Sequence, residues 1–243
     1  MPTPTIGFIY PDHAAEDDYP RAEALLDAHL PVAHIYGTDL HAVPELLDLG
    51  SPGKLRDGAA RLAVHRPDAI VWACTSGSFV YGPDGAREQV RALSEVAGVP
   101  AASTSFAFVR AAQALNLRRV AVAASYPADV AGLFADFLAD AGITVVGFAS
   151  AGIETAAEVG TLDAGQVLAL ARANDHPEAE ALLIPDTAMH TLEVLPRLEA
   201  TLGKPVLTAN QVTIWEGLRL AGVTRIVPSL GALFAERPAY VGH

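Results

Sequence analysis

The sequence contains one cysteine, Cys74, and only two lysines, Lys54 and Lys204, in 243 residues. A single cysteine excludes an intramolecular disulfide and is typical of proteins from the reducing cytoplasm, where we expect this chain to act. The scarcity of lysine and the formal net charge of −12 argue against a nucleic-acid partner. Phosphate backbones are bound by clustered basic side chains, and this chain has no such cluster.

Long apolar runs and metal-binding patterns are also missing. No uninterrupted apolar stretch reaches about 18 residues, so the sequence predicts no transmembrane helix and no membrane partner. The first residues lack the basic flank and apolar run of a signal peptide. The eight histidines show no His-x-x-x-His spacing, and we therefore expect no metal site.

Apolar residues, by contrast, are plentiful. They make up 51% of the chain, which is enough for a sizeable core. Short apolar runs alternate with longer amphipathic segments, and the runs are continuous rather than alternating, as in parallel strands covered on both faces. This rhythm predicts an α/β fold with right-handed crossovers.

The same patterns predict the individual elements. The predicted strands span residues 6–10, 32–36, 69–73, 101–102, 120–124, 144–148, 181–184, 206–208 and 226–228. The predicted helices span residues 19–28, 55–64, 85–97, 105–115, 128–141, 164–173, 189–202 and 211–221. We expect one half of the protein to consist of residues 1–113 with 212–243, and the other of residues 114–211.

The two predicted halves resemble each other in sequence. Three segments of the first half are echoed in the same order in the second: residues 5–11, 68–79 and 98–104 by residues 119–127, 180–191 and 203–209. Such echoes predict two similar Rossmann-like parallel-sheet halves related by a pseudo-two-fold axis. Since ligands gather at the carboxyl ends of parallel strands, we expect the active site to lie between the halves.

Cys74 follows a predicted strand and precedes the turn Thr75-Ser76-Gly77-Ser78. Backbone N–H groups at such a position stabilise a thiolate and make the cysteine a candidate nucleophile. The hydroxyl groups of Thr75 and Ser76, with neighbouring amides, suit the binding of an anion. A lone cysteine is also commonly a small buried apolar side chain, and the local sequence leaves both interpretations open.

Asp186 occupies the position in the second half that matches Cys74 in the first. It is a candidate for proton transfer, or alternatively the N-cap of a following helix. Tyr126 follows the strand predicted at 120–124, where its phenol either donates to a carboxylate or enolate or closes the core. Asn210 follows the strand predicted at 206–208 and is a weaker candidate.

These residues resemble the Asp/Glu racemase superfamily, most specifically its maleate isomerase and arylmalonate decarboxylase branch. The resemblance spans nearly the whole chain and rests on residues 73–79, Tyr126, Thr187 with residues 192–195, and residues 203–211. It implies two Rossmann-like halves around one pocket and chemistry without a cofactor or metal. The implied partner is a small carboxylate or dicarboxylate substrate.

The resemblance also implies roles for individual residues. Cys74 keeps the position of the nucleophile, whereas the second cysteine of the family is replaced by Asp186, so that a mechanism built on Cys74 is favoured. Together these two form the candidate catalytic pair. The candidate substrate-binding residues are Pro11, Asp12, Thr75, Ser76, Tyr126, Thr187 and Asn210.

The leading functional hypothesis is a cofactor-independent cis–trans isomerase of a small dicarboxylate, of the maleate-to-fumarate type. The Cys74 thiolate would add to the alkene, the adduct would rotate, and elimination would release the trans product. The alternatives are a racemase, decarboxylase or lyase that uses a Cys/Asp pair, and a non-catalytic dicarboxylate-binding protein. A compact α/β enzyme of this kind is also expected to form a homo-oligomer.

Overall fold

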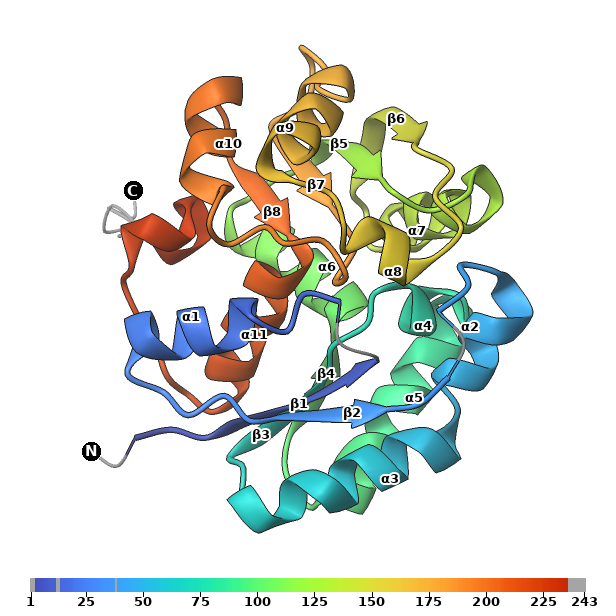
Figure 1. The fold of residues 1–243 in the computed structure, drawn as a ribbon, viewed down its shortest axis with the longest axis vertical. Coiled ribbons are helices and arrows are strands. Elements are labelled where there is room, and N and C mark those ends of the chain that lie inside the picture. Colours follow the sequence, from blue (N-terminus) through green and yellow to red (C-terminus); the bar gives the residue numbers. More distant parts are fainter. Residues whose placement is uncertain (1–2, 12–13, 38, 236–243) are drawn as a thin grey trace.

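The computed structural model of the protein describes residues 3–11, 14–37 and 39–235 (Figure 1). It contains two four-stranded sheets in which every strand pairs in parallel with its neighbours. The strand order is β2-β1-β3-β4 in the first sheet and β6-β5-β7-β8 in the second. The two orders are equivalent, which confirms the predicted α/β fold with two similar parallel-sheet halves.

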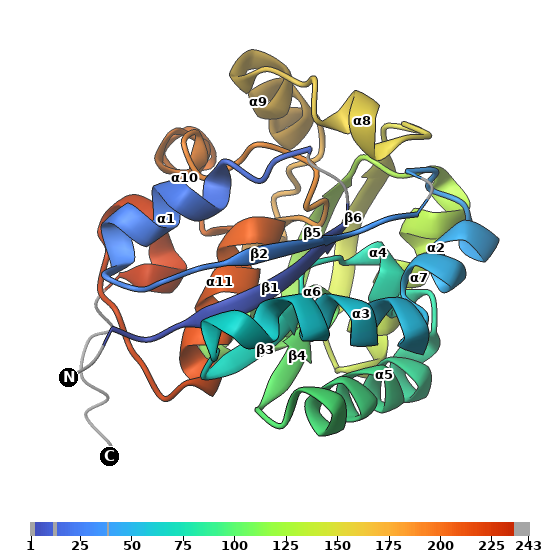
Figure 2. The same cartoon turned by 60° about the horizontal axis from the view of Figure 1, so that its bottom comes forward.

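The central strands of both sheets are buried on both faces, because helices cover each side of the sheet. The cartoon in Figure 2 shows helices on both sides of the first sheet. The strands are β1 (Ile6–Pro11), β2 (Val32–Ile35), β3 (Ala69–Trp72) and β4 (Ala101–Ser103), then β5 (Arg119–Ala124), β6 (Thr144–Ser150), β7 (Ala181–Ile184) and β8 (Val206–Thr208).

Most helices lie close to their predicted positions. The α-helices are α1 (Asp18–Leu26), α2 (Val43–Leu49), α3 (Pro52–Leu62), α4 (Ser76–Phe79), α5 (Gly82–Ala97), α6 (Thr104–Ala114), α7 (Ala128–Asp140), α8 (Ala156–Val159), α9 (Ala164–Ala173), α10 (Leu195–Leu202) and α11 (Ala209–Leu220). Short 3₁₀ helices span Ala63–His65, Pro228–Leu230 and Ala232–Phe234. Within the described residues, none of these helices is long and apolar enough to cross a membrane.

Two predicted elements differ from the structure. The strand predicted at 226–228 is wrong: Pro228, which has no backbone N–H to donate, begins a 3₁₀ helix there. The helix predicted at 189–202 begins only at Leu195, where a proline in the first turn favours helix initiation. The short helices α2, α4 and α8 were not predicted, because they have too few residues to show a helical period.

The helix α11 connects the two halves. It follows β8 of the second sheet but packs against α6, β3 and β1 of the first (Figures 1 and 2). This placement is in keeping with a C-terminal segment that returns to the first half, although the predicted boundaries at 113/114 and 211/212 stay predictions. Gly217 makes the close approach possible, since a Cβ atom there would lie 2.4 Å from Ile6 Cγ2.

The substitution Gly217→Ala therefore tests this packing. The added methyl group meets two fully buried strands, and we expect the free energy of unfolding to fall by about 1–3 kcal/mol. Gly132→Ala, in α7, is the matched control because a Cβ there contacts nothing within 4 Å, and it should gain up to about 1 kcal/mol from helix propensity. Urea unfolding of both variants measures the difference; equal stabilities would contradict the packing.

Candidate active site

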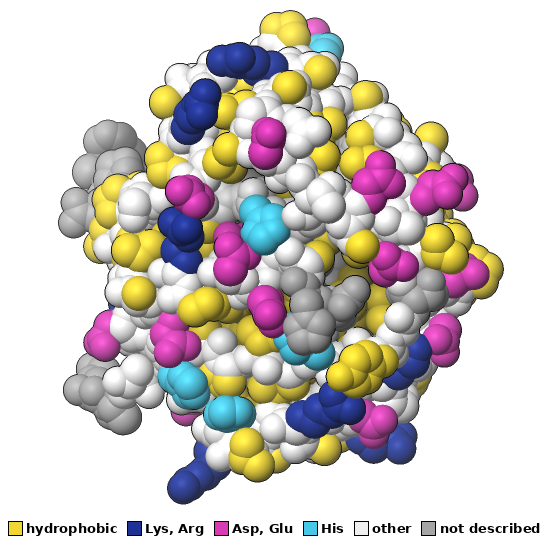
Figure 3. All heavy atoms as spheres, in the orientation of Figure 1, with side chains coloured by type: hydrophobic (Ala, Val, Ile, Leu, Met, Phe, Trp, Pro, Cys, Tyr) yellow, Lys and Arg dark blue, Asp and Glu magenta, His cyan; other side chains and the backbone are white. Residues whose placement is uncertain are grey.

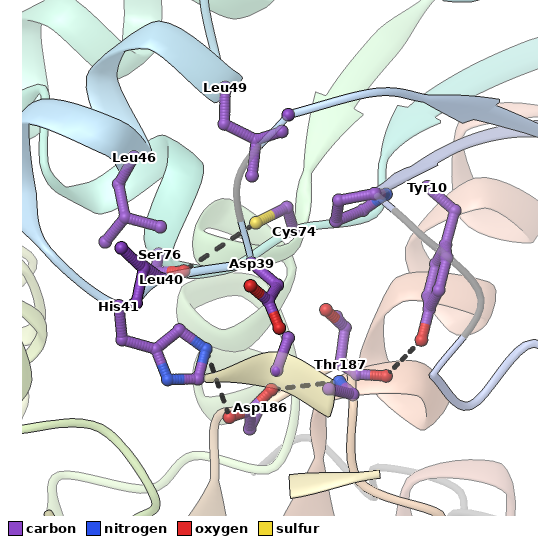
Figure 4. Close-up of a pocket in the computed structure, with 14 residues that line it drawn as sticks. Tyr10, Asp39, Leu40, His41, Leu46, Leu49, Cys74, Ser76, Asp186 and Thr187 are labelled. Atoms are coloured by element: carbon purple, nitrogen blue, oxygen red, sulfur yellow. Dashed lines mark hydrogen bonds and ion pairs between the residues drawn. The ribbon is translucent and has the colours of Figure 1, made fainter. Parts of the chain in front are cut away.

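A pocket with about 490 Å³ of empty space lies between the two halves, beyond the carboxyl ends of β1, β3 and β7 (Figure 4). Both halves contribute to its wall. The first half supplies Tyr10, Pro11, Gly37, Asp39, Leu40, His41, Leu46, Leu49, Cys74 and Ser76, and the second half supplies Ala156, Asp186, Thr187 and Ala188.

Cys74 lies between the end of β3 and the start of α4, and its side chain is buried. Its Sγ accepts a hydrogen bond from Gly77 N at 3.3 Å and lies 3.7 Å from Ser76 Oγ. Burial nevertheless raises the pKa of the thiol to about 11, because desolvation outweighs these contacts and Asp186 adds a further unfavourable charge. The direction is opposite to the one that the strand-end position predicts, and Cys74 is a neutral thiol near pH 7.

Asp186 lies across the pocket from Cys74 (Figure 4) and is also buried. Ser125 Oγ donates to one of its carboxylate oxygens, and Ala188 N donates to the other at 2.9 Å. These contacts form a local turn, and the next helix, α10, begins only at Leu195. Asp186 is therefore not a helix N-cap, and the alternative that the sequence left open is excluded.

His41 was not predicted as a site residue, yet it is the closest titratable partner of Asp186. Its Nε2 lies 3.9 Å from Asp186 Oδ2, and its ring packs edge-on against Tyr126 at a centroid distance of 5.0 Å. The side chain is buried. No sequence signal identifies it, since it lies in an irregular segment between β2 and α2 and has no motif around it.

Tyr126 and Thr75 lie just outside the pocket wall. The Tyr126 hydroxyl donates to the carbonyl oxygen of Pro185, and burial raises its pKa well above its ordinary value. The buried hydroxyl of Thr75 lies beside the Tyr126 hydroxyl, and a hydrogen bond between the two lowers the pKa of Tyr126 against the larger effect of burial. Thr75 has no other hydrogen-bond partner among the described residues.

The remaining candidates have different positions. Pro11, Ser76 and Thr187 line the pocket, whereas Asp12 lies outside the described residues. Asn210 does not line the pocket: its Nδ2 donates to Thr187 O at 3.2 Å and to Asp18 Oδ2 at 3.0 Å. Asn210 therefore supports the loop that follows β7 without lining the pocket.

Asp18 and Tyr10 complete the support of this loop. Asp18, at the start of α1, accepts hydrogen bonds from Thr191 N and Leu192 N at 3.3 and 3.4 Å. Tyr10, at the end of β1, donates to Thr187 O at 2.5 Å. Burial raises the pKa of Asp18 to about 6. An acidic residue at a helix start is common, so the sequence did not distinguish Asp18 from an ordinary surface aspartate.

One wall of the pocket is apolar. Leu40, Leu46, Leu49 and Ala156 form it, and the described lining contains no lysine or arginine. Among the residues that the structure describes, no group of three His, Cys, Asp or Glu side chains is placed to hold a metal ion. The pocket thus combines a thiol, a carboxylate, hydroxyl groups and an apolar surface.

Two parallel-sheet halves that enclose one buried cysteine place this chain among the Asp/Glu racemase-like enzymes. Within that class the chain belongs to the arylmalonate decarboxylase family, whose family model matches residues 51–234. It is 32% identical to the arylmalonate decarboxylase of Bordetella bronchiseptica over 238 residues, which are 96% of this chain and 98% of that protein.

Maleate isomerases are also relatives. The chain is 30% identical to the maleate isomerase of Nocardia farcinica (strain IFM 10152) over 182 residues, 71% of each protein. Among solved structures, it resembles a liganded arylmalonate decarboxylase variant in which a cysteine replaces a glycine and a serine replaces a cysteine. That similarity has a TM-score of 0.84 at 28% identity and covers 96% of this chain and 99% of the other.

The raised pKa of Cys74 predicts slow alkylation. With a pKa of about 11, the thiolate fraction at pH 7 to 8 is about 100-fold lower than for a thiol of ordinary pKa. The greater intrinsic nucleophilicity of a basic thiolate recovers about tenfold of this, so we expect a rate at least about tenfold below that of the urea-unfolded chain. Iodoacetamide labelling followed by mass spectrometry gives the rate; alkylation as fast as in the unfolded chain would contradict the raised pKa.

Asp18 predicts a specific pH dependence of stability. Its pKa rises from 3.8 to about 6 on folding, so ionisation of Asp18 opposes folding, and the penalty grows between about pH 4 and pH 6 to about 3 kcal/mol. The stability of the wild type relative to Asp18→Asn should therefore decrease by about that amount over this range. Urea unfolding at a series of pH values tests this. The control is the exposed Asp57→Asn, which should show a flat difference.

Proposed function

We propose that this protein is a cofactor-independent decarboxylase of an α-substituted malonate, with Cys74 as the proton donor. The observation that carries the proposal is the state of Cys74: a buried, neutral thiol in a pocket with an apolar wall. The full-length similarity to an arylmalonate decarboxylase supports it. A malonate carries two carboxylates on one carbon. The pocket has a polar side near Cys74 and an apolar wall, so it offers the two carboxylates different surroundings.

The polar side suits the carboxylate that is retained. When the C–C bond to the leaving carboxylate breaks, its electron pair stays on Cα and spreads into the retained carboxylate as an enediolate. Ser76, which lines the pocket with its hydroxyl 3.7 Å from Cys74 Sγ, supports this assignment because it can donate to the charge that develops on these oxygens. Removing one such donor typically costs about 3–4 kcal/mol of transition-state stabilisation.

The apolar wall suits the carboxylate that departs. Leu40, Leu46 and Leu49 cannot hydrogen-bond an ionised carboxylate, whereas the product of its cleavage, CO₂, is neutral and apolar. Desolvation therefore favours the transition state, in which charge moves from this group toward Cα. The Cys74 S–H then donates its proton to Cα. One proton is consumed for each CO₂ released, and the resulting thiolate is reprotonated from solvent.

The isomerase hypothesis from the sequence is the second candidate, and the similarity to maleate isomerase favours it. Addition to an alkene requires a thiolate, however, and the burial of Cys74 stabilises the thiol instead. Racemase and lyase activities, a non-catalytic carboxylate-binding role, the homo-oligomer and the cytoplasmic location stay predictions.

An NMR time course in D₂O distinguishes these activities. Separate samples contain phenylmalonate, butylmalonate, maleate and aspartate, with ¹³C-labelled carboxylates to follow CO₂. We expect CO₂ and an α-deuterated monocarboxylate from a malonate. Cys74→Ala should lower kcat by about 10²–10⁴-fold, since it removes the proton donor. Val64→Ala, at a surface position that is 78% exposed, is the control and should retain full activity.

The remaining results would each point to a different activity. Fumarate from maleate, without CO₂ from any malonate, would establish the isomerase instead. Loss of the Cα–H signal of aspartate alone would favour a racemase. A Cys74→Ala variant that releases CO₂ at the wild-type rate would overturn the role of Cys74 even if decarboxylation itself is observed.

A further inference from the structure

The pocket must bind an anion although its own titratable side chains are mainly acidic. Asp39 and Asp186 line it, and no lysine or arginine does so among the described residues. The formal net charge of the chain is −12. Figure 3 shows acidic side chains spread across the middle of the face that it draws. Lys54 Nζ lies near Gly37 at the edge of the pocket, but it is paired with Asp48 at 2.5 Å. Hydroxyl and amide donors can bind a carboxylate there, and a positive charge at the pocket wall would strengthen that binding.

Among the described residues that line the pocket, His41 is the only histidine, a side chain whose imidazole can carry a positive charge. Its backbone is fixed by contacts between the two halves. His41 N donates to Glu154 O at 2.7 Å, and Ala156 N donates to Asp39 O at 2.9 Å. An isolated antiparallel bridge between Leu40 and Thr155 lies between these bonds. The segment between β2 and α2 is thus held against the second half, and this contact buries the imidazole.

The tautomer of His41 follows from its partners. Its Nδ1 lies 3.1 Å from the carbonyl oxygen of Ile153, and a carbonyl can only accept, so Nδ1 carries a proton. The other ring nitrogen, Nε2, lies 3.9 Å from Asp186 Oδ2. In Figure 4 the dashed line from His41 to Asp186 lies at the pocket wall. A proton added at Nε2 would lie between this carboxylate and a bound anion.

We propose that His41 is the anion-recognising residue of this pocket, and that a substrate carboxylate binds together with one proton taken up at His41 Nε2. The inference rests on the proposed function for the nature of the anion, a carboxylate, but not for the bond that is broken. Asp186 is then the partner that stabilises the imidazolium, its two oxygens being oriented by Ser125 and Ala188 N. The net charge of the pocket is unchanged when a monocarboxylate enters.

The groups around His41 agree with this role. Asp186 faces it from the end of β7, Tyr126 from the end of β5, and Asp39 lies in its own segment. Glu154, from the loop after β6, contacts it through its backbone carbonyl. Across the pocket, Cys74 is neutral. None of these groups is cationic, so each anion that enters increases the tendency of His41 to take up a proton.

Calorimetry with phenylacetate and malonate as probes tests the proposal. Binding heats at pH 7.5 in buffers of different ionisation enthalpy give the number of protons taken up. We expect net proton uptake on binding of each probe, and a Kd that increases with pH, as binding coupled to protonation requires. His41→Gln should take up no proton, bind at least tenfold more weakly at pH 7.5, and show no pH dependence.

Two further variants separate the charge of His41 from that of the nearby Lys54. His41→Lys carries a permanent charge, so it should bind without proton uptake and with an affinity that does not change with pH; it also provides the test if His41→Gln does not fold. Lys54→Gln should behave as the wild type. Undiminished proton uptake by His41→Gln, or loss of uptake in Lys54→Gln, would overturn the proposal.

The wild type can also contradict the proposed role of His41. It would do so by binding the probes without proton uptake, or by binding neither probe. These results are separable from the activity. CO₂ release from malonates without proton-coupled binding would remove the role of His41 and leave the decarboxylase proposal intact. Proton-coupled binding without any CO₂ release would keep the role of His41 and remove the decarboxylase proposal.

Discussion

The chemistry of this pocket depends on the exclusion of water from the space between the ends of β3 and β7. Cys74 and Asp186 are both buried there, and desolvation keeps the thiol protonated although a backbone N–H points at its sulfur. In an exposed pocket the same N–H would favour the thiolate, and the chemistry would change from proton donation to nucleophilic attack. Burial therefore favours the proposed proton donation over nucleophilic attack.

Water exclusion in turn depends on how the halves are held together. On one side of the pocket, backbone hydrogen bonds join the segment that carries His41 to the loop after β6. On another side, Tyr10 and Asn210 bind the carbonyl of Thr187, and Asp18 binds the backbone that follows it. Through these contacts each half positions residues of the other.

The two halves have equivalent strand orders, but their chemistry at equivalent positions differs. The end of β3 presents a thiol, while the end of β7 presents a carboxylate with a histidine beside it. Two identical groups would suit the removal and return of a proton on opposite faces of a substrate. The unequal pair suits a reaction that delivers a proton from one side, with the other side serving to bind and balance charge.

The sequence by itself determined the parallel α/β halves, since continuous apolar runs and internal echoes are local patterns, and it placed Cys74 and Asp186 at matching strand ends. It did not predict the 3₁₀ helix that begins at Pro228 or the contact of Asn210 with Asp18 outside the pocket. Nor did it predict that His41 lies beside Asp186 in the pocket. The partners of these side chains are distant in the chain. Only the tertiary structure decided the protonation of Cys74, because desolvation depends on what surrounds a side chain rather than on its neighbours in sequence.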